Sequence, residues 1–217
     1  MREKLSKVRN QLEDSRLRVL QLQNNLERYE EAGMRDVVTT IGNRRFFEAA
    51  LAEEMERARV TGDDLCLALA DLDRFKLIND RHGHLVGDRI LRLFGEILTR
   101  NVRGQDRVAR FGGEEFAILF PGADLPQAAE AAERIRKVLE SKQWTLEQSG
   151  ERVGKVTVSI GLAKLRPNET GADFVRRANA HLYEAKANGR NRMVGDDAEV
   201  ESPPASLKRY SRMAPPS

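Results

Sequence analysis

Hydrophobic and polar positions follow three different periods along the chain, and each period predicts a different kind of element. Near the start, apolar positions recur every seven residues in two series, Leu5, Leu12, Val19 and Leu26, and Val8, Ser15, Leu22 and Tyr29. The two series fit the a and d positions of about four heptads. We therefore predict a coiled-coil dimerisation helix over residues 1–34, ended by Gly33. A single amphipathic helix lying against the following domain is the alternative.

Helical and strand-like periods alternate through the middle of the chain. Apolar residues at helical spacing predict helices over 44–60, 75–81, 87–102, 124–144 and 171–188, the last followed by Gly189. Short apolar runs predict strands over 65–70, 108–111, 116–120 and 153–164, with a bulge at Gly161. This order predicts an α+β fold, with a central sheet and flanking helices, in one domain over 35–195. Pro, Ser, Glu and Asp dominate from Asp196 onward, which predicts a disordered tail over 196–217.

Composition argues against several classes of function. Charged residues make up 33% of the 217 residues, but the formal net charge is only +3, unlike that of a dedicated nucleic-acid binder. The single cysteine, Cys66, excludes an intramolecular disulfide framework. The chain has no apolar run long enough for a membrane span, and its polar start does not resemble a signal peptide. We therefore expect a cytoplasmic protein with no membrane segment.

Acidic residues are concentrated at two places, both next to predicted strands. Gly112-Gly113-Glu114-Glu115 joins the strands 108–111 and 116–120, and its two glycines suit a tight turn with positive φ. Asp71 ends the apolar strand 65–70, with Asp73 two residues further on. If the two strands are neighbours in one sheet, three or four carboxylates converge. A solvated turn is the alternative for the Gly-Gly-Glu-Glu segment.

Converging carboxylates would need a cation. Like charges at short range raise one another's pKa, and a hard divalent cation removes that cost. Oxygen ligands without imidazole or thiolate favour Mg²⁺ over zinc. Because Mg²⁺ held by few carboxylates completes its shell with water and substrate phosphates, the pattern points to a nucleoside triphosphate.

Basic and amide side chains suited to such a substrate lie nearby in the sequence. Lys76, Lys186 and Arg190 could contact phosphate oxygens, although each could equally be a solvated surface charge. Asn79 and Asp88 together could read a guanine base, and the alternative for Asp88 is a residue at a helix N-terminus.

These motifs, in this order, resemble the GGDEF family, the diguanylate cyclases of bacteria, over Asp36 to Val194. The matching segments are Asp36 to Arg45, Asp71 to Asp80, Gly83-His84, Gly87-Asp88, Gly112 to Phe116, Ser159 to Gly161 and Tyr183 to Asn191. The first is the poorest match, because Val38, Ile41 and Gly42 depart from the usual pattern.

The resemblance implies a palm-like fold, shared with nucleotidyl cyclases, and one GTP on each of two facing protomers. Each GTP would attack the other, releasing two pyrophosphates and closing cyclic di-GMP. Two Mg²⁺ ions in each half-site, with Mn²⁺ as the alternative, would be held by Asp71, the Leu72 carbonyl, Glu114 and Glu115, and Glu114 or Glu115 would help activate the attacking hydroxyl. Substrate contacts would come from Phe75, Lys76, Asn79, Asp88, Gly112, Gly113, Lys186 and Arg190. Arg103 and Asp106 match the family's RxxD inhibitory site for the product, with Arg134 assisting from the next helix.

The resemblance also gives the N-terminal helix a purpose. One half-site cannot complete the reaction, so a coiled coil would promote activity by bringing two half-sites together in a homodimer. Three rival interpretations stay open: a catalytically inactive module that senses GTP or cyclic di-GMP, a structural dimerisation element, and a cyclase acting on a single nucleotide.

Overall fold

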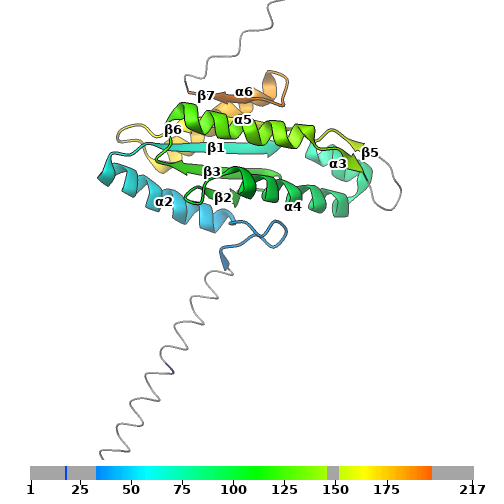
Figure 1. Cartoon of the computed structure of the whole chain (residues 1–217), viewed down its shortest axis with the longest axis horizontal. Helices are drawn as coiled ribbons and strands as arrows, with labels where there is room; N and C mark the ends of the chain where they lie inside the picture. Colours follow the sequence, from blue (N-terminus) through cyan, green and yellow to red (C-terminus); the bar gives the residue numbers. More distant parts are fainter. Residues whose placement is uncertain (1–17, 19–32, 146–151, 197–217) are drawn as a thin grey trace, which may run out of the picture.

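A computed structural model describes residue 18 and residues 33–145 and 152–196 (Figure 1). The coiled coil predicted for 1–34 lies outside the described residues, apart from Arg18, Gly33 and Met34. The tail predicted for 196–217 also lies outside them, apart from Asp196. Both predictions therefore stay predictions.

A five-stranded sheet with strand order β2-β3-β1-β6-β7 forms the centre of the fold (Figure 1). Its middle strand, β1 (Leu65–Leu72), is buried along its whole length, as expected for an apolar run covered on both faces. It pairs antiparallel with β3 (Glu115–Pro121) on one side and β6 (Val158–Lys164) on the other. The outer strands are β2 (Arg107–Arg110), antiparallel to β3, and β7 (Met193–Gly195), parallel to β6.

Helices cover both faces of this sheet, which confirms the predicted α+β fold. Alternate residues of β1 belong to two separate cores: Cys66 and Ala68 pack with α4 (His84–Asn101) and α5 (Leu125–Ser141). Leu65 and Leu67 pack with α2 (Arg44–Thr61) and α6 (Gly171–Ala187) on the other face. The period of two along β1 thus decides which core each side chain joins.

Helix starts agree with capping residues in the sequence. The side chains of Asn43, Asp124 and Thr170 accept hydrogen bonds from backbone N–H groups in the first turns of α2, α5 and α6. Gly83, with φ +82°, is the only residue between α3 (Phe75–His82) and α4. The predicted helix over 87–102 therefore begins three residues earlier than expected, at His84.

The strand predicted over 153–164 is wrong in two respects. It divides into β5 (Arg152–Gly154), which pairs with the short strand β4 (Trp144–Thr145), and β6. Gly161 does not form a bulge, because the register between β1 and β6 continues through the pair Leu69 and Gly161. A Cβ at Gly161 would lie 2.1 Å from the Ala178 carbonyl oxygen, so glycine is required here for the close approach of α6.

The C-terminal edge of the domain extends further than the sequence suggests. The strand β7 was not predicted, since three half-buried residues give too short a hydrophobic pattern. Asp196, which the sequence assigned to the tail, accepts a hydrogen bond from the Lys164 N–H and forms ion pairs with Arg166 and Arg177. The folded part therefore includes this residue.

Candidate active site

Two of the predicted acidic residues lie directly opposite each other on neighbouring strands. In the register of β1 and β3, Asp71 is paired with Glu115. Directly paired residues of an antiparallel sheet point to the same face, so both carboxylates lie on the face covered by α2 and α6. The Leu72 N–H donates to the Glu114 carbonyl at 3.2 Å, which fixes the second glutamate beside the end of β1. The structure thus brings together the two acidic segments as predicted.

The turn that carries the glutamates is held by its own backbone. The N–H groups of Phe111 and Gly112 both donate to the Glu115 carbonyl, at 2.8 and 3.1 Å. The predicted reason for the glycines is wrong, because neither Gly112 nor Gly113 has a positive φ. A Cβ at Gly112 would instead lie 2.4 Å from Glu115 Oε2. Glycine at this position makes room for the Glu115 carboxylate.

Arg110 ties this turn to the segment that precedes the domain core. Its Nη2 and Nε donate to the Gly113 carbonyl at 2.6 and 3.2 Å, and its Nη1 contacts both Asp36 carboxylate oxygens at 3.2 Å. Asp36 also accepts from the N–H and hydroxyl of Thr39, and these bonds together hold the pKa of Asp36 below its usual range despite its partial burial. Nothing in the sequence indicates this role of Arg110, because its partner Asp36 lies 74 positions away.

Lys186, from the end of α6, supplies the positive charge at the acidic site. Its Nζ lies 2.7 Å from Asp71 Oδ2, and Asp71 is buried. Burial raises the pKa of Asp71 above its usual range, the ion pair with Lys186 lowers it, and the Glu115 and Asp73 charges raise it further. Burial raises the pKa of Glu114 as well, with the Asp71 charge as the next cause. The site therefore holds more negative charge than Lys186 alone compensates.

Asp73 does not join this acidic site. It accepts hydrogen bonds from the hydroxyls of Thr157 and Ser159, at 2.7 and 2.6 Å, and from the Asn191 N–H at 3.0 Å. These three donors satisfy a buried carboxylate and connect the end of β1 to β6 and to the loop after α6. Three of the expected three or four carboxylates therefore meet at the site, and the fourth, Asp73, has a structural role.

The oxygen atoms at the site fit Mg²⁺. Within residues 33–145 and 152–196, no group of three or more acidic, histidine or cysteine side chains is placed so that it could hold a metal ion by itself. Mg²⁺, however, commonly uses one or two carboxylates and takes its remaining ligands from carbonyls, water and substrate phosphates. Asp71 and Glu114 are carboxylates with raised pKa values, and a cation would relieve their repulsion. The donor set therefore suits a hard cation delivered together with a phosphate substrate.

The predicted guanine readers lie where α3 meets α4. Asn79 Oδ1 is buried and has no hydrogen-bond partner among the described residues. A Cβ at Gly87 would lie 1.9 Å from that oxygen and 3.1 Å from Phe75 Cζ, so Asn79 and Phe75 both pack against the first turn of α4. Asp88, the next residue, is half-buried in the same turn. Buried polar atoms are normally hydrogen-bonded, so this amide oxygen is left to accept a hydrogen bond from a group outside the described residues.

The remaining predicted phosphate contacts are more dispersed. Lys76 is exposed on α3, and Arg190 is exposed beyond the end of α6, with a φ of +60°. Arg190 lines a cavity together with Asp73 and Arg74. The structure therefore places Lys186 at the acidic site, whereas Lys76 and Arg190 are exposed on α3 and on the loop after α6.

The predicted inhibitory residues form a compact turn after α4. The Arg103 N–H donates to Asp106 Oδ2 at 2.7 Å, and the Asp106 N–H donates to the Arg103 carbonyl at 3.0 Å. Arg134 donates from α5 to the Asn101 carbonyl at 2.9 Å. Burial raises the pKa of Asp106, while the charges of Arg103 and Arg134 lower it. The three residues thus act on one another electrostatically.

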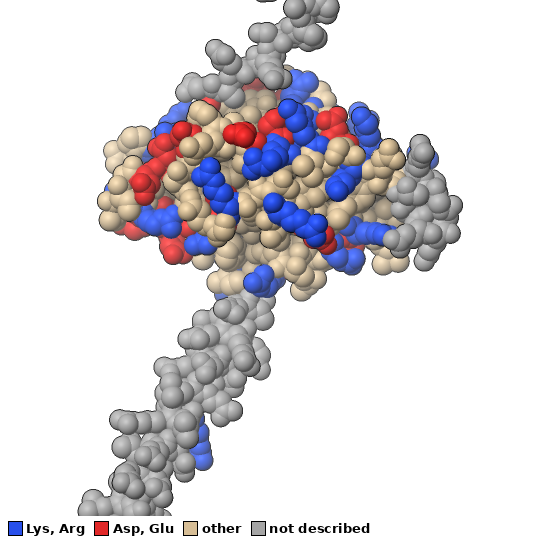
Figure 2. Space-filling model, in the orientation of Figure 1, with Lys and Arg blue, Asp and Glu red and all other residues tan. Residues whose placement is uncertain are grey.

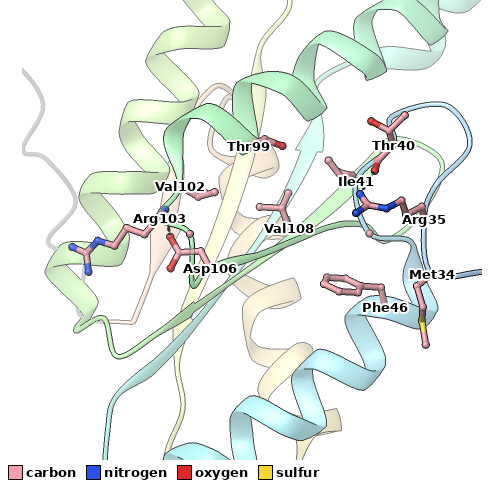
Figure 3. A pocket seen from close by; sticks show the side chains of 12 residues that line it. Met34, Arg35, Thr40, Ile41, Phe46, Thr99, Val102, Arg103, Asp106 and Val108 are labelled. Carbon is pink, nitrogen blue, oxygen red and sulfur yellow. Dashed lines mark hydrogen bonds between the residues drawn. The ribbon is translucent and has the colours of Figure 1, made fainter. Parts of the chain in front are cut away.

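A cavity of about 960 Å³ separates this turn from the segment before α2. Arg103 and Asp106 lie at one end of it and Arg35 and Thr40 at the other, with apolar side chains including Val108 between them (Figure 3).

On the face that carries α4 and α5, Lys and Arg side chains lie scattered among acidic and uncharged ones, not in one continuous patch (Figure 2). No helix within the described ranges is both long enough and apolar enough to cross a bilayer.

Comparison with known proteins gives consistent results. The family model described as "Diguanylate cyclase, GGDEF domain" matches residues 33–192. The response regulator PleD of Caulobacter vibrioides is 39% identical over 178 residues, which cover 82% of this chain and 39% of PleD. The diguanylate cyclase DgcP of Pseudomonas aeruginosa is 36% identical over 170 residues, covering 78% of this chain and 25% of DgcP. This chain thus matches well under half the length of these two relatives.

Solved structures agree with the fold. The coiled coil and GGDEF domain of DgcB from Caulobacter crescentus, crystallised in complex with c-di-GMP, matches with a TM-score of 0.81 and 33% identity, covering 87% of this chain and 99% of that one. The diguanylate cyclase SiaD of Pseudomonas aeruginosa, in complex with its activator SiaC, matches with a TM-score of 0.74 and 34% identity, covering 88% of this chain and 74% of that one.

Proposed function

Because the chain belongs to the GGDEF family of diguanylate cyclases, we propose that it condenses two GTP molecules into cyclic di-GMP and two pyrophosphates. The observation that supports this most directly is the register that pairs Asp71 with Glu115, next to the ammonium of Lys186. The carboxylates that the reaction needs, and a cation suited to phosphate, are all present at one end of the sheet. A degenerate binding module would have no need to keep them.

Each residue has a defined part in the proposed reaction. Asp71, Glu114, Glu115 and the Leu72 carbonyl would hold two Mg²⁺ ions, which supply stabilisation of the charge that builds on the attacking and leaving oxygens. Asn79 and Asp88 hold the guanine base, with Phe75 packed beside Asn79. Lys76, Lys186 and Arg190 contact the phosphates, while Gly112 and Gly113 let the turn approach them closely.

Proton transfer belongs to the glutamates of the turn. Glu114 or Glu115 accepts the proton of the ribose 3′-hydroxyl, and the oxygen attacks the α-phosphorus of the facing GTP as pyrophosphate leaves. The second bond forms in the same way with the two nucleotides exchanged.

Two protomers are needed, since one set of these residues serves one GTP. We propose a homodimer held through the N-terminal heptads, with the site assembled between two facing domains. We also propose that cyclic di-GMP inhibits the enzyme by binding Arg103, Asp106 and Arg134. The location of these residues in one turn and the neighbouring helix, outside the acidic site, supports a separate inhibitory site.

A single experiment separates this function from its rivals. Purified full-length chain is incubated with GTP and Mg²⁺, and the nucleotides are separated by anion-exchange chromatography. A cyclase yields cyclic di-GMP, whereas an inactive sensor leaves GTP unchanged and a single-nucleotide cyclase yields cyclic GMP. The initial rate per protomer should rise with protein concentration until the dimer is saturated. Absence of cyclic di-GMP at every protein concentration would refute the proposal.

A further inference from the structure

A second cavity, of about 350 Å³, lies on a face of α3 different from the one that meets α4. Phe75 and Asn79 are four residues apart and pack toward Gly87. Arg74, Ile78 and Arg81, spaced by four and three residues, line the cavity instead. Its other walls come from the segment before β6 and from the loop after α6.

Positive charge dominates this lining. Arg74 and Arg81 come from α3 and its N-cap, Lys155 from the segment between β5 and β6, and Arg190 from the loop after α6. Three segments that are distant in sequence therefore place cations around one hollow. A hollow of this volume is within the range of small-ligand sites, and its cations favour an anion.

Two of the polar side chains that could read a nucleobase, those of Asp73 and Asn191, already form hydrogen bonds within the protein. Asp73, the single carboxylate among the described residues of the lining, accepts three hydrogen bonds, from Thr157, Ser159 and the Asn191 N–H. The side-chain oxygen of Asn191 accepts from Arg136 at 2.8 Å. Recognition in this cavity is therefore left mainly to cations, which suits an inorganic anion better than a nucleotide.

The backbone around the cavity is unusual. Arg74, Arg190 and Asn191 have φ values of +56°, +60° and +49°, a region that side chains other than glycine seldom adopt. Such conformations persist where the surrounding structure enforces them, and they cluster at functional sites. Here they turn the ends of β1 and α6 so that Arg74 and Arg190 line the same hollow.

We propose that this cavity binds inorganic polyphosphate, and that its ligand is the pyrophosphate released by the proposed cyclase reaction. Arg190 belongs both to the proposed substrate-phosphate contacts and to this lining, so one side chain is shared by the cavity and the proposed substrate site. Pyrophosphate bound there occupies Arg190 and thereby lowers the affinity of the proposed substrate site for the next GTP. The inference rests on the proposed function for the source of the ligand, but not for the anion site itself.

Titration calorimetry of the full-length chain with sodium pyrophosphate, at low ionic strength and without divalent cation, tests the site. Lys155→Gln and Arg81→Gln each remove one lining cation, and we expect each to raise Kd about tenfold, since each removes a charged hydrogen-bond donor to the anion. Lys137→Gln is the matched control. Lys137 and Lys155 are both exposed lysines in long ion pairs with α5 glutamates, at 3.5 Å and 4.0 Å.

The outcomes are distinct. Binding that weakens in both cavity variants and not in the control supports the site. Wild-type protein that binds no pyrophosphate, binding unchanged in both cavity variants, or equal weakening in the control would each overturn it.

The cyclase assay gives a second test of the cavity, independent of the calorimetric titration. In the cyclase assay, we expect Lys155→Gln to keep the wild-type KM for GTP while added pyrophosphate inhibits it about tenfold less strongly. Inhibition by pyrophosphate that is unchanged in Lys155→Gln would contradict the inference. Failure of wild-type protein to form cyclic di-GMP would refute the proposed function alone, because the calorimetric titration needs no turnover.

Discussion

Lys186 and Asp71 form an ion pair of 2.7 Å between the end of α6 and the end of β1. The pair joins two residues that lie more than a hundred positions apart in the sequence, and it lies next to the two glutamates of the turn. Lys186 thus has two functions in the proposed mechanism: it compensates the buried carboxylate, and it offers its remaining N–H donors to a phosphate.

Replacing this lysine tests both functions. We expect Lys186→Gln to lower kcat/KM for GTP about thirtyfold or more, because loss of a charged hydrogen-bond partner costs roughly 2 kcal/mol or more. Lys164→Gln is the control, since Lys164 forms a similar 2.8 Å pair with Asp64 far from the turn. Equal losses in the two variants would mean that Lys186 acts only through stability.

The raised pKa of Asp71 predicts how its replacement changes stability with pH. A carboxyl whose folded pKa is raised favours the fold below its unfolded pKa, and this contribution is lost as the pH rises through the folded value. In metal-free buffer at neutral pH, Asp71→Asn should therefore unfold at a higher temperature than the wild type. The difference should shrink as the pH falls toward about 4, where the wild-type carboxyl is protonated too.

Thermal unfolding followed by circular dichroism measures this effect. Asp63→Asn is a suitable control, because Asp63 lies exposed in the turn before β1. An Asp71→Asn variant that is less stable than the wild type at neutral pH, or whose advantage grows in acid, would contradict the electrostatic description of the site.

Arg110 is expected to position the catalytic turn. Its guanidinium contacts Asp36 and the Gly113 carbonyl at once, which the ammonium of a lysine cannot do with the same geometry. We expect Arg110→Lys to lower kcat about tenfold, for roughly 1.4 kcal/mol of lost hydrogen bonding, with a smaller change in KM. Arg59→Lys, in an exposed pair with Glu56, serves as the control. An unchanged kcat would show that the turn keeps its geometry without Arg110.

Arg103 should control inhibition by the product. We expect Arg103→Ala to require at least about tenfold more cyclic di-GMP for half-inhibition, because a bidentate contact to phosphate is lost. The measurement is the ratio of initial rates with and without added cyclic di-GMP. Arg100→Ala, three residues earlier on α4 and paired with Glu96, should keep the wild-type ratio. Inhibition that persists unchanged in Arg103→Ala would place the inhibitory site elsewhere.

The sequence predicted the helices and the strands β1 and β3 because local signals coincide there. Apolar runs, capping residues such as Asp124, and the Gly-Gly-Glu-Glu turn each specify structure within a few positions. The convergence of Asp71 with Glu115 followed from one assumption, that the strands carrying them are adjacent in the sheet, and the register confirms it.

What the sequence could not predict depends on contacts between distant segments. The partners of Asp73 lie 84 to 118 positions away, so its local pattern could not distinguish it from the site residue Asp71. Gly161 and Gly112 are required by what lies opposite them, a helix backbone in one case and a carboxylate in the other, and not by the φ that their own residue type permits. The three residues of β7 form a strand only because β6 offers an open edge.

The most direct test of the central claim is the yield of cyclic di-GMP from Glu115→Gln compared with the wild type, at saturating GTP and Mg²⁺. Glu56→Gln, an exposed glutamate on α2, is the control. Loss of a metal-binding and proton-accepting carboxylate should lower the initial rate by about a hundredfold or more, while the control keeps the wild-type rate. Synthesis of the dinucleotide at the wild-type rate by Glu115→Gln would contradict the account.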